Sequence, residues 1–335
     1  MEPKHKQIKR GPRVLLLPVT TRCNAKCVMC SIWKQESRSI SSEFLSKVFD
    51  DGSLVNDLEY LGVTGGEPTM LPDLPDIVSF IIGKSRVLKE ISFNTNGLLT
   101  DNVLGIVKRL ISITKDRGIK LSVYVSLDGV GEIHDQVRGI NGFFKKTSST
   151  IKGLKEITEN EKTVELSLNS VVNALNADHV LETFKFAKSI GVPINFSLVM
   201  RTTTCINSAN SEVDFEILPK QTHKLKKFFS KMKMVSRVNG ESSLEYNYYK
   251  HVIGMLNNEP RQLVCPFADG DGCLIDPFGN VYPCGVSNEL FMGNLFEMPF
   301  EKIWFNDDFH NSLPTRLRKF CVDCESNCFI HAAKA

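Results

Sequence analysis

Six short apolar segments recur along the first 200 residues of the chain, and patterns typical of helices separate them. Most of the segments are nearly continuous apolar runs, as buried parallel strands tend to be. They lie at 14–20, 58–65, 90–97, 121–129, 164–172 and 194–200. The helical patterns lie at about 41–52, 73–84, 100–117, 143–158 and 176–190. This alternation predicts right-handed βαβ units. Six units favour an incomplete α/β barrel over a flat doubly wound sheet or a complete eight-unit barrel.

Polar residues collect where the predicted strands end. The sequences TTRC, TGGEP, NTNG, SLDG and NSVVN all fall at or just after the carboxyl end of a predicted strand. In α/β barrels this rim carries the active site, and a doubly wound sheet also gathers its site there. We therefore expect the functional residues of the first 200 positions to meet at one edge of the sheet.

The pattern changes after Met200. A polar loop follows, then two helical stretches near 217–237 and 242–257, and from Cys265 onward the chain is rich in loops. In this last part, IDPFGNVYPC predicts a β-hairpin whose turn lies between Ile275 and Val281. We expect four parts: a flexible N-terminus (1–12), a barrel (13–216), a helical connection (217–258) and a small cysteine-rich domain (259–335).

The composition is that of an ordinary globular protein, with 42% hydrophobic and 24% charged residues and a net charge of +3. Such a small charge implies no strong attraction to nucleic acid or to a membrane. The N-terminus lacks the apolar run and the cleavage site of a secretory signal, and no segment approaches the roughly 18 apolar residues of a membrane span. We therefore expect a cytoplasmic protein, in which cysteines stay reduced.

The ten cysteines are clustered: three at 23–30, one at 205, three at 265–284 and three at 321–328. In a reducing compartment such clusters indicate metal ligands or catalytic groups rather than disulfides. Cys23, Cys27 and Cys30 follow the first predicted strand with the spacing C-x3-C-x2-C. Zinc would need a distant fourth ligand, whereas an iron–sulfur cluster on three thiolates leaves one iron open to a substrate. Unmetallated core cysteines are a third interpretation.

This spacing, with the apolar Met29 directly before Cys30, resembles the radical S-adenosylmethionine (radical SAM) superfamily over residues of about 13–200. The resemblance implies a partial (β/α)6 TIM-like barrel that binds S-adenosylmethionine (SAM) and a [4Fe–4S] cluster with an open iron site. It also implies that one electron from the cluster cleaves SAM to a 5′-deoxyadenosyl radical, which takes a hydrogen atom from substrate. A reducing partner such as flavodoxin or ferredoxin is implied as well.

The resemblance further assigns SAM contacts to the rim motifs. GGEP is expected to hold the methionine amino group, the fourth-strand region to contact the ribose and the carboxylate, and SLVM to pass the adenine. The residues so assigned are Met29, Gly65, Gly66, Glu67, Pro68, Asn94, Asn96, Ser126, Arg138 and Leu198. Taken singly, each motif has a plainer interpretation: the glycines and asparagines suit turns, Arg138 suits a surface ion pair, and His134 and Asp135 suit a helix start.

The C-terminal segment resembles the SPASM and shorter Twitch extensions of the same superfamily. Cys265, Gly279 and Cys284 fit the first part of their signature, and three further cysteines follow. Two features of a full SPASM pattern are missing, so the resemblance favours one auxiliary [4Fe–4S] cluster over two. Its expected ligands are Cys265, Cys284, Cys321 and Cys324, with Cys273 and Cys328 as alternatives. A zinc ribbon is the other interpretation. Electron acceptance, substrate ligation and structural support all remain open as roles for the cluster.

Three functions are compatible with this pattern. The first is a radical enzyme that oxidises or epimerises one carbon of a small polar metabolite, such as a sugar or an aminocyclitol. The second is a maturase that crosslinks, oxidises or epimerises a side chain of a peptide or protein. The predicted barrel begins by residue 14, which leaves no N-terminal module for a leader peptide and favours the first. The third, a non-catalytic iron–sulfur or zinc protein, has no need of GGEP and SLDG.

One further cysteine is a candidate for catalysis. Cys205 lies on the polar loop after the sixth predicted strand, near the expected mouth of the barrel. A thiol there would return a hydrogen atom to a substrate radical and so complete an epimerisation. A plain loop cysteine is the alternative, and Cys273 has a similar claim to the donor role.

Overall fold

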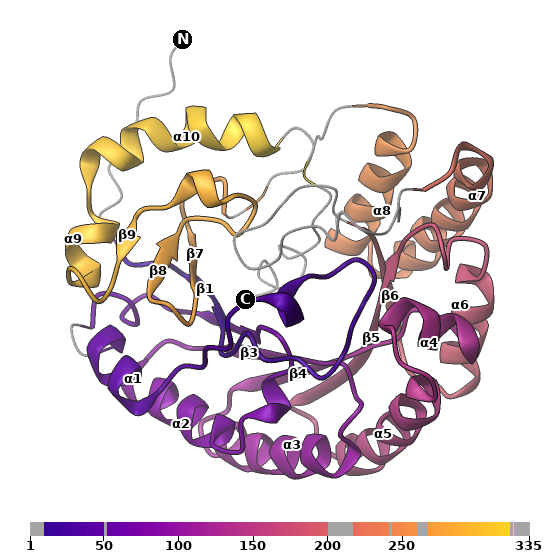
Figure 1. Ribbon diagram of the computed structural model, residues 1–335, viewed down its shortest axis with the longest axis horizontal. Coiled ribbons are helices and arrows are strands. Elements are labelled where there is room, and N and C mark those ends of the chain that lie inside the picture. The colour runs from indigo at the N-terminus through magenta and orange to yellow at the C-terminus, as the bar shows by residue number, and fades with distance from the viewer. Residues whose placement is uncertain are drawn as a thin grey trace.

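The computed structural model describes residues 10–49, 52–199, 217–240, 243–259, 265, 267–321 and 324. Cys205 and Cys328, two of the cysteines singled out above, lie outside these residues. In the described part of the chain, one nine-stranded sheet forms the centre and helices cover its outer side (Figure 1).

The sheet has the strand order β6-β5-β4-β3-β2-β1-β7-β8-β9. Strands β1 to β6 each pair in parallel with the next strand in sequence, as successive βαβ units require. Their bounds are β1 Val14–Pro18, β2 Tyr60–Thr64, β3 Glu90–Thr95, β4 Lys120–Ser126, β5 Val164–Val172 and β6 Ile194–Leu198. All six strands predicted from the apolar runs are confirmed, and the open strand order confirms a partial barrel.

Helices follow the barrel strands and lie along the outer side of the sheet (Figure 1). They are α1 Ser42–Phe49, α2 Leu74–Lys84, α3 Thr100–Lys115, α4 Glu132–Arg138, α5 Phe143–Thr158 and α6 Val180–Ser189. Five of them match helical patterns in the sequence. The sequence does not predict α4, because a seven-residue helix with only Ile133 and Val137 apolar is too short for a periodic pattern.

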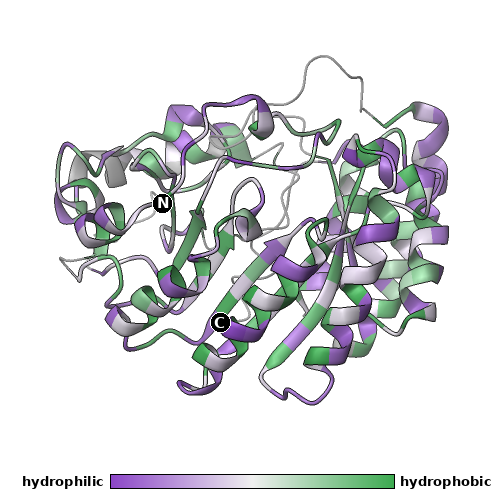
Figure 2. Ribbon diagram, turned by 60° about the horizontal axis from the view of Figure 1, so that its bottom comes forward, coloured by the Kyte–Doolittle hydropathy of each residue, from purple (hydrophilic) through white to green (hydrophobic). Residues whose placement is uncertain are grey.

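The outer face of the barrel strands is apolar. Side chains alternate between the two faces of a strand, and the apolar positions on the outer face pack in the main hydrophobic core. Figure 2 shows hydrophobic and hydrophilic positions along the strands and helices. Ile91, Phe93, Leu121, Val123 and Val125 are all completely buried there. The hydrophobic core of the barrel therefore lies between the sheet and the helices.

The inner face of the same strands is mainly small or polar. Its members are Glu90, Ser92, Asn94, Lys120, Ser122, Tyr124, Ser126, Glu165, Ser167, Asn169, Val171, Asn195 and Ser197. Hydrogen bonds join some of these side chains. Asn195 Nδ2 donates to Asn169 Oδ1 at 3.4 Å, and Ser122 Oγ donates to a carboxylate oxygen of Glu90 at 2.6 Å. The interior of the barrel is thus lined mainly by hydroxyl and amide groups, with Glu90, Lys120 and Glu165 near the starts of the strands.

The C-terminal region continues the sheet of the barrel. β7 (Gly272–Ile275) pairs in parallel with β1, and β8 (Asn280–Tyr282) and β9 (Gly293–Asn294) add antiparallel strands. Ile275 lies opposite Val281, which confirms the predicted hairpin. The Asp276 carboxylate holds the turn, because it accepts hydrogen bonds from the backbone N–H groups of Phe278 and Asn280, each at 2.9 Å.

The described helices of the second half are α7 Pro219–Ser236, α8 Leu244–Met255, α9 Phe300–Trp304 and α10 Asp307–Cys321. α7 and α8 pack together beside β6, while α9 and α10 lie beside β7 to β9 (Figure 1). The Tyr249 hydroxyl of α8 accepts a hydrogen bond from the backbone N–H of Phe196 at 3.3 Å, which covers part of the free edge of β6. In the part of the chain that the structure describes, no helix has the length and hydropathy needed to cross a bilayer.

Candidate functional site

The loop after β1 carries the three cysteines of the first cluster, and the end of α4 holds one side of it. The backbone N–H of Lys26 donates to the carbonyl of Arg138 at 3.1 Å, and that of Val28 donates to the carbonyl of Val137 at 3.0 Å. Gly139 permits this close approach, since its φ is +72° and a Cβ there would lie 2.2 Å from the Lys26 carbonyl oxygen. The middle cysteine of the loop is therefore flanked by two fixed residues.

The GGEP loop after β2 holds the other side. The backbone N–H of Gly66 donates to the carbonyl of Thr20 at 2.7 Å, and that of Glu67 donates to the carbonyl of Arg22 at 2.8 Å. A Cβ on Gly65 would lie 2.4 Å from the Thr20 oxygen, and one on Gly66 would lie 2.1 Å from the Arg22 oxygen. The glycines are needed for this packing. Their own carbonyl oxygens accept no hydrogen bond within the described residues.

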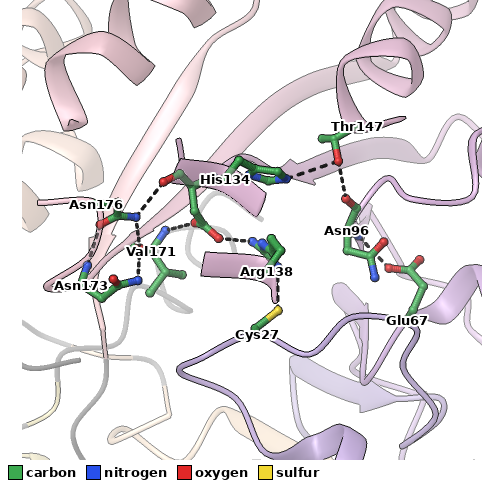
Figure 3. Close-up of polar contacts among 10 residues, drawn as sticks. Cys27, Glu67, Asn96, His134, Arg138, Thr147, Val171, Asn173 and Asn176 are labelled. Atoms are coloured by element: carbon green, nitrogen blue, oxygen red, sulfur yellow. Dashed lines mark hydrogen bonds and ion pairs between the residues drawn. The ribbon is translucent and has the colours of Figure 1, made fainter. Parts of the chain in front are cut away.

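Glu67 joins GGEP to the NTNG loop after β3. It is 1% exposed, and one carboxylate oxygen accepts hydrogen bonds from the hydroxyls of Thr69 at 2.6 Å and Thr95 at 2.7 Å. The other oxygen accepts from the backbone N–H of Asn96 at 2.7 Å (Figure 3). Burial raises the pKa of Glu67, and these donors act against that rise. The second oxygen keeps capacity for one more donor.

Asn96 brings the NTNG loop against the first cysteine. Its Nδ2 donates to Asn24 Oδ1 at 2.7 Å and lies 4.0 Å from the Cys23 sulfur. Asn94 and Ser126, by contrast, occupy inner-facing positions of β3 and β4. Of these three predicted SAM contacts, Asn96 therefore lies beside the cysteines, whereas Asn94 and Ser126 face the barrel interior.

The remaining predicted contacts are spread along the same rim. Met29 packs in a small apolar cluster with the three cysteines of the loop. Pro68 is buried at the start of a short 3-10 helix, Pro68–Met70, and Leu198 is the buried last residue of β6. Each lies near the carboxyl end of a barrel strand, as the strand-end pattern of the sequence predicts.

Arg138 lies inside the site rather than on the surface. It is 7% exposed, its Nη2 lies 2.6 Å from the Asp128 carboxylate, and its Nη1 donates to the Cys27 sulfur at 3.6 Å (Figure 3). Its Nε is buried and finds no hydrogen-bond partner within the described residues. The interpretation of Arg138 as a surface ion-pair residue is therefore wrong, and its guanidinium touches a cysteine of the cluster loop.

Asp128 is a site residue that the sequence analysis missed. It is completely buried, and one carboxylate oxygen accepts a hydrogen bond from the backbone N–H of Val171 at 2.7 Å while the other pairs with Arg138. Its backbone N–H donates to His134 Nδ1 at 3.1 Å, and its carbonyl accepts from Asn176 Nδ2 at 2.9 Å. SLDG marked the region, but only the fold shows that this carboxylate meets the arginine.

The thiols of the first cluster are poor acids in the absence of a metal. Burial raises the pKa of Cys23 to about 11 and that of Cys30 to about 12, and it also raises the pKa of Cys27. The charge of Arg138 opposes the rise most strongly at Cys27. These cysteines therefore need a positively charged centre to become thiolate ligands.

The arrangement of acidic, thiol and imidazole groups argues against a single metal ion. Thiolates around one zinc ion must lie within roughly 4 Å of each other, because each Zn–S bond is about 2.3 Å long. Among the described residues, no three cysteine, histidine or acidic side chains converge in a way that could hold one ion. A cubane cluster spreads its ligand sulfurs further apart, so the cysteine loop suits a cluster better than zinc.

The donors and acceptors around the loop fit a bound amino acid group. SAM carries an ammonium, which needs acceptors, and a carboxylate, which needs donors. Acceptors are present in the open carbonyls of Gly65 and Gly66 and in the second oxygen of Glu67. Buried donors without a partner are Asn24 Nδ2 and Arg138 Nε. Both kinds of group lie beside the three cysteines.

The C-terminal cysteines gather where the hairpin meets α10. Cys284, Cys321 and Cys324 pack in one apolar cluster, with Val286, Leu290, Leu313 and Leu317. Cys265 and Cys284 pack in a second cluster, with Val14, Leu16, Tyr60 and Phe267. Because Cys284 belongs to both clusters, the four cysteines preferred as auxiliary ligands lie around one place.

Cys273 is placed differently. It lies in β7 opposite Leu15 of β1 and is completely buried in the main core of the barrel. Burial raises its pKa well above the usual range. It occupies the position of a core residue in the main core, against which Cys265 also packs, and it is a member of neither of the two smaller apolar clusters.

Known protein families match both halves of the chain. The model described as the radical SAM superfamily matches residues 17–204, and the SPASM model, described as an iron–sulfur cluster-binding domain, matches residues 265–328. The first match covers more than half of the chain and includes the cysteine loop, GGEP, NTNG and SLDG. The second includes the four gathered cysteines.

Individual relatives are similar over most of the chain. An AdoMet-dependent heme synthase of Methanosarcina barkeri is 24% identical, over 94% of this chain and 89% of the relative. The mycofactocin maturase MftC of Mycolicibacterium smegmatis is 25% identical, over 92% of this chain and 74% of the relative. The solved structure of native anSMEcpe with bound AdoMet and Cp18Cys peptide aligns with a TM-score of 0.62 and 19% identity, over 96% of this chain and 94% of that one. At this identity the likeness concerns the fold alone.

Proposed function

Since this chain belongs to the radical SAM superfamily and carries a SPASM cluster-binding domain, its cofactors are SAM and [4Fe–4S] clusters, and we propose that it oxidises or epimerises a carbon of a small polar metabolite. When bound, these cofactors supply a 5′-deoxyadenosyl radical that abstracts a hydrogen atom from substrate. The protein's own contribution is to hold the cofactors, to orient the substrate and to keep water away from the radical.

The residues around the first cysteine loop have separate roles in this proposal. Cys23, Cys27 and Cys30 bind the cluster. The open carbonyls of GGEP and the free capacity of Glu67 take the ammonium of SAM, and the unpaired Nε of Arg138 takes its carboxylate. The Glu67 carboxylate and the Nε of Arg138 are buried groups that lack a full set of partners, and such groups are costly unless a ligand satisfies them.

The polar inner face of the barrel carries the proposal for the substrate. Positions that face inward on β3 to β6 are mostly serines and asparagines, with one tyrosine, one valine and three charged residues near the strand starts, whereas the outer positions of the same strands are mostly apolar. Neutral hydroxyl and amide groups recognise substrates with many hydroxyl or amino groups, since each polar group of the substrate then finds a partner. A sugar or an aminocyclitol fits such a lining, and an apolar ligand does not.

The auxiliary site supports oxidation as one outcome. Cys265 and Cys284 pack against Val14 and Leu16 of β1, and β1 is a strand of the barrel. A cluster held there by Cys265, Cys284, Cys321 and Cys324 would accept the electron of a substrate radical across that strand. Epimerisation would need a hydrogen-atom donor instead. Cys205 is the residue that the sequence predicts for this role. A small acidic electron carrier such as flavodoxin or ferredoxin remains the expected reductant.

A peptide maturase is the second candidate. One relative, MftC, is named a maturase, and a solved structure of the same fold contains a bound peptide. The same inner face would then receive a polar side chain of a peptide rather than a free metabolite. The cofactor sites would be unchanged, so only the substrate distinguishes the two candidates.

Transfer of deuterium tests the proposal. The reconstituted enzyme is incubated without oxygen with SAM, a reductant and perdeuterated sugars or aminocyclitols, and 5′-deoxyadenosine is analysed by mass spectrometry. Incorporation of deuterium from one of them is expected, and Asn195→Ala should lower its rate at least about tenfold by removing an inner-face partner. Asn102→Ala, an exposed asparagine of α3, is the matched control. Deuterium transfer only from a peptide would favour the maturase.

A further inference from the structure

We propose that the buried Asp128–Arg138 pair positions Cys27 and raises the reduction potential of the cluster bound to the first three cysteines. In this role Arg138 acts through a ligand of the cluster, in addition to any contact with SAM. The inference rests on the proposed placement of that cluster at Cys23, Cys27 and Cys30, and the experiment below tests the two separately.

The end of α4 contacts the middle of the cysteine loop through both its backbone and a side chain. Lys26 and Val28, on either side of Cys27, donate their backbone N–H groups to the carbonyls of Arg138 and Val137. The side chain of Arg138 then reaches the sulfur of Cys27 from the same helix end, at 3.6 Å (Figure 3). Three contacts from two neighbouring residues therefore fix one cysteine.

The sulfurs of Cys23 and Cys27 differ in the groups that donate hydrogen bonds to them. Cys23 has neutral partners only, since its sulfur accepts from the backbone N–H of Ala25 at 3.4 Å and lies near the side-chain amide of Asn96 at 4.0 Å. At Cys27 the donor is a guanidinium, which carries a full charge. A charge-assisted hydrogen bond is stronger than a neutral one, so the electrostatic effect is concentrated on the middle ligand.

Asp128 keeps the guanidinium in place. Its carboxylate is fixed by the backbone N–H of Val171 and lies 2.6 Å from Arg138 Nη2. The peptide of Asp128 is itself held by His134 and Asn176. A buried ion pair is costly to desolvate, and the only sulfur that this pair is seen to contact in the described residues belongs to the cluster loop. The free-energy cost of burying the pair is explained if the pair acts on the cluster.

The sign of the effect follows from charge. A reduced cluster carries one more negative charge than an oxidised one, so a nearby cation and an N–H···S hydrogen bond stabilise the reduced state and raise the potential. The carboxylate of Asp128 opposes this effect. It does not cancel it, because Arg138 Nη1 contacts the Cys27 sulfur, whereas the Asp128 carboxylate lies at the other amino group of the guanidinium, Nη2.

The test is an anaerobic redox titration of the reconstituted full-length chain, followed by electron paramagnetic resonance in the absence of SAM. The signal of the first cluster is the one that disappears in Cys27→Ala. In Arg138→Met the equilibrium constant for its reduction is expected to fall at least about tenfold, which is about 59 mV for a one-electron couple. An intact first cluster with an unchanged midpoint would overturn the inference, because a residue that only binds the SAM carboxylate cannot affect a SAM-free titration.

Two further variants keep the test decisive. Arg138→Met combined with Asp128→Asn removes the pair without leaving an unpaired buried carboxylate, and it should also lower the midpoint or release the first cluster from a folded chain. Arg109→Met removes an exposed ion pair with Asp76, at 2.7 Å, and should leave the midpoint unchanged. If Cys27→Ala retains every signal of the wild type, the placement of the cluster is wrong instead.

Discussion

The two cysteine sites of this protein both include apolar packing, but the first also has a network of buried polar and charged contacts. The first lies on a loop that polar contacts hold in place: backbone hydrogen bonds to α4 and GGEP, and side-chain contacts from Asn96 and Arg138. The second lies between apolar side chains of the hairpin and α10. Both sites gather cysteines, but they surround them with different chemistry.

This difference indicates a difference in function. A site that must bind a zwitterionic cofactor and take up an electron needs buried donors, acceptors and a cation, and the first site has them. A site that only keeps or passes an electron, or that supports a small region of the fold, is served by an apolar enclosure.

Removing the middle ligand of the first site should have the largest effect. Cys27→Ala is expected to abolish the release of 5′-deoxyadenosine and to reduce the iron content from about eight to about four per chain, because two thiolates cannot retain the cluster. Iron analysis and chromatography of the products measure both. Normal cleavage of SAM in this variant would contradict the account of the first site.

Removing the ligand shared by both apolar clusters should have a more limited effect. Cys284→Ala is expected to lose the auxiliary iron, about four per chain, while the first cluster still cleaves SAM. Cys273→Ala is the matched control, since that cysteine lies in the barrel core and should leave the iron content unchanged. If Cys273→Ala loses iron and Cys284→Ala keeps it, the preferred ligand set is wrong.

A cavity in the apolar surroundings of the second site should lower the free energy of unfolding. Leu317 of α10 is 2% exposed and packs with Cys321 and Cys324. Leu317→Ala should lower the free energy of unfolding by about 2–5 kcal/mol, the usual cost of a large-to-small change in a core. Leu181→Ala, at a position that is 42% exposed, should change it by less than about 0.5 kcal/mol. Equal effects in thermal denaturation would show that the second site is not held by packing.

The polar network of the first site should respond to pH. Burial lowers the pKa of His134 from 6.5 to about 3, so the folded chain keeps this imidazole neutral where the unfolded chain protonates it. Stability should therefore fall as the pH drops below about 6.5, by about 2 kcal/mol at pH 5. His134→Asn keeps an acceptor for the Asp128 N–H and should lack this part of the pH dependence. Parallel stability curves from pH 7 to pH 5 would contradict this assignment.

The sequence predicts most of the barrel because its signals are local. Each buried strand is a nearly continuous apolar run, and each motif stands at the end of its own strand. The pairing of β7 with β1 could not be predicted, since Cys273 and Leu15 are neighbours only in the folded sheet. The hairpin itself was predictable, because its turn residues are adjacent in the chain.

The sequence predicts where the first site lies, but not which of its side chains contact each other. The cysteine spacing and GGEP mark it, and the family match agrees. That Arg138 contacts Cys27 and pairs with Asp128 depends on how α4 folds back onto the loop, and no spacing in the sequence encodes it. In the same way, only the fold separates Cys273 from the four cysteines that gather around Cys284.

The most direct test of the central claim is anaerobic reconstitution of the wild-type chain with iron and sulfide, followed by reduction in the presence of SAM. About eight irons per chain and formation of 5′-deoxyadenosine are expected. A chain that holds about four irons would lack the auxiliary cluster. A chain with a full complement of iron that yields no 5′-deoxyadenosine, with all three cysteines of the first loop intact, would contradict the account.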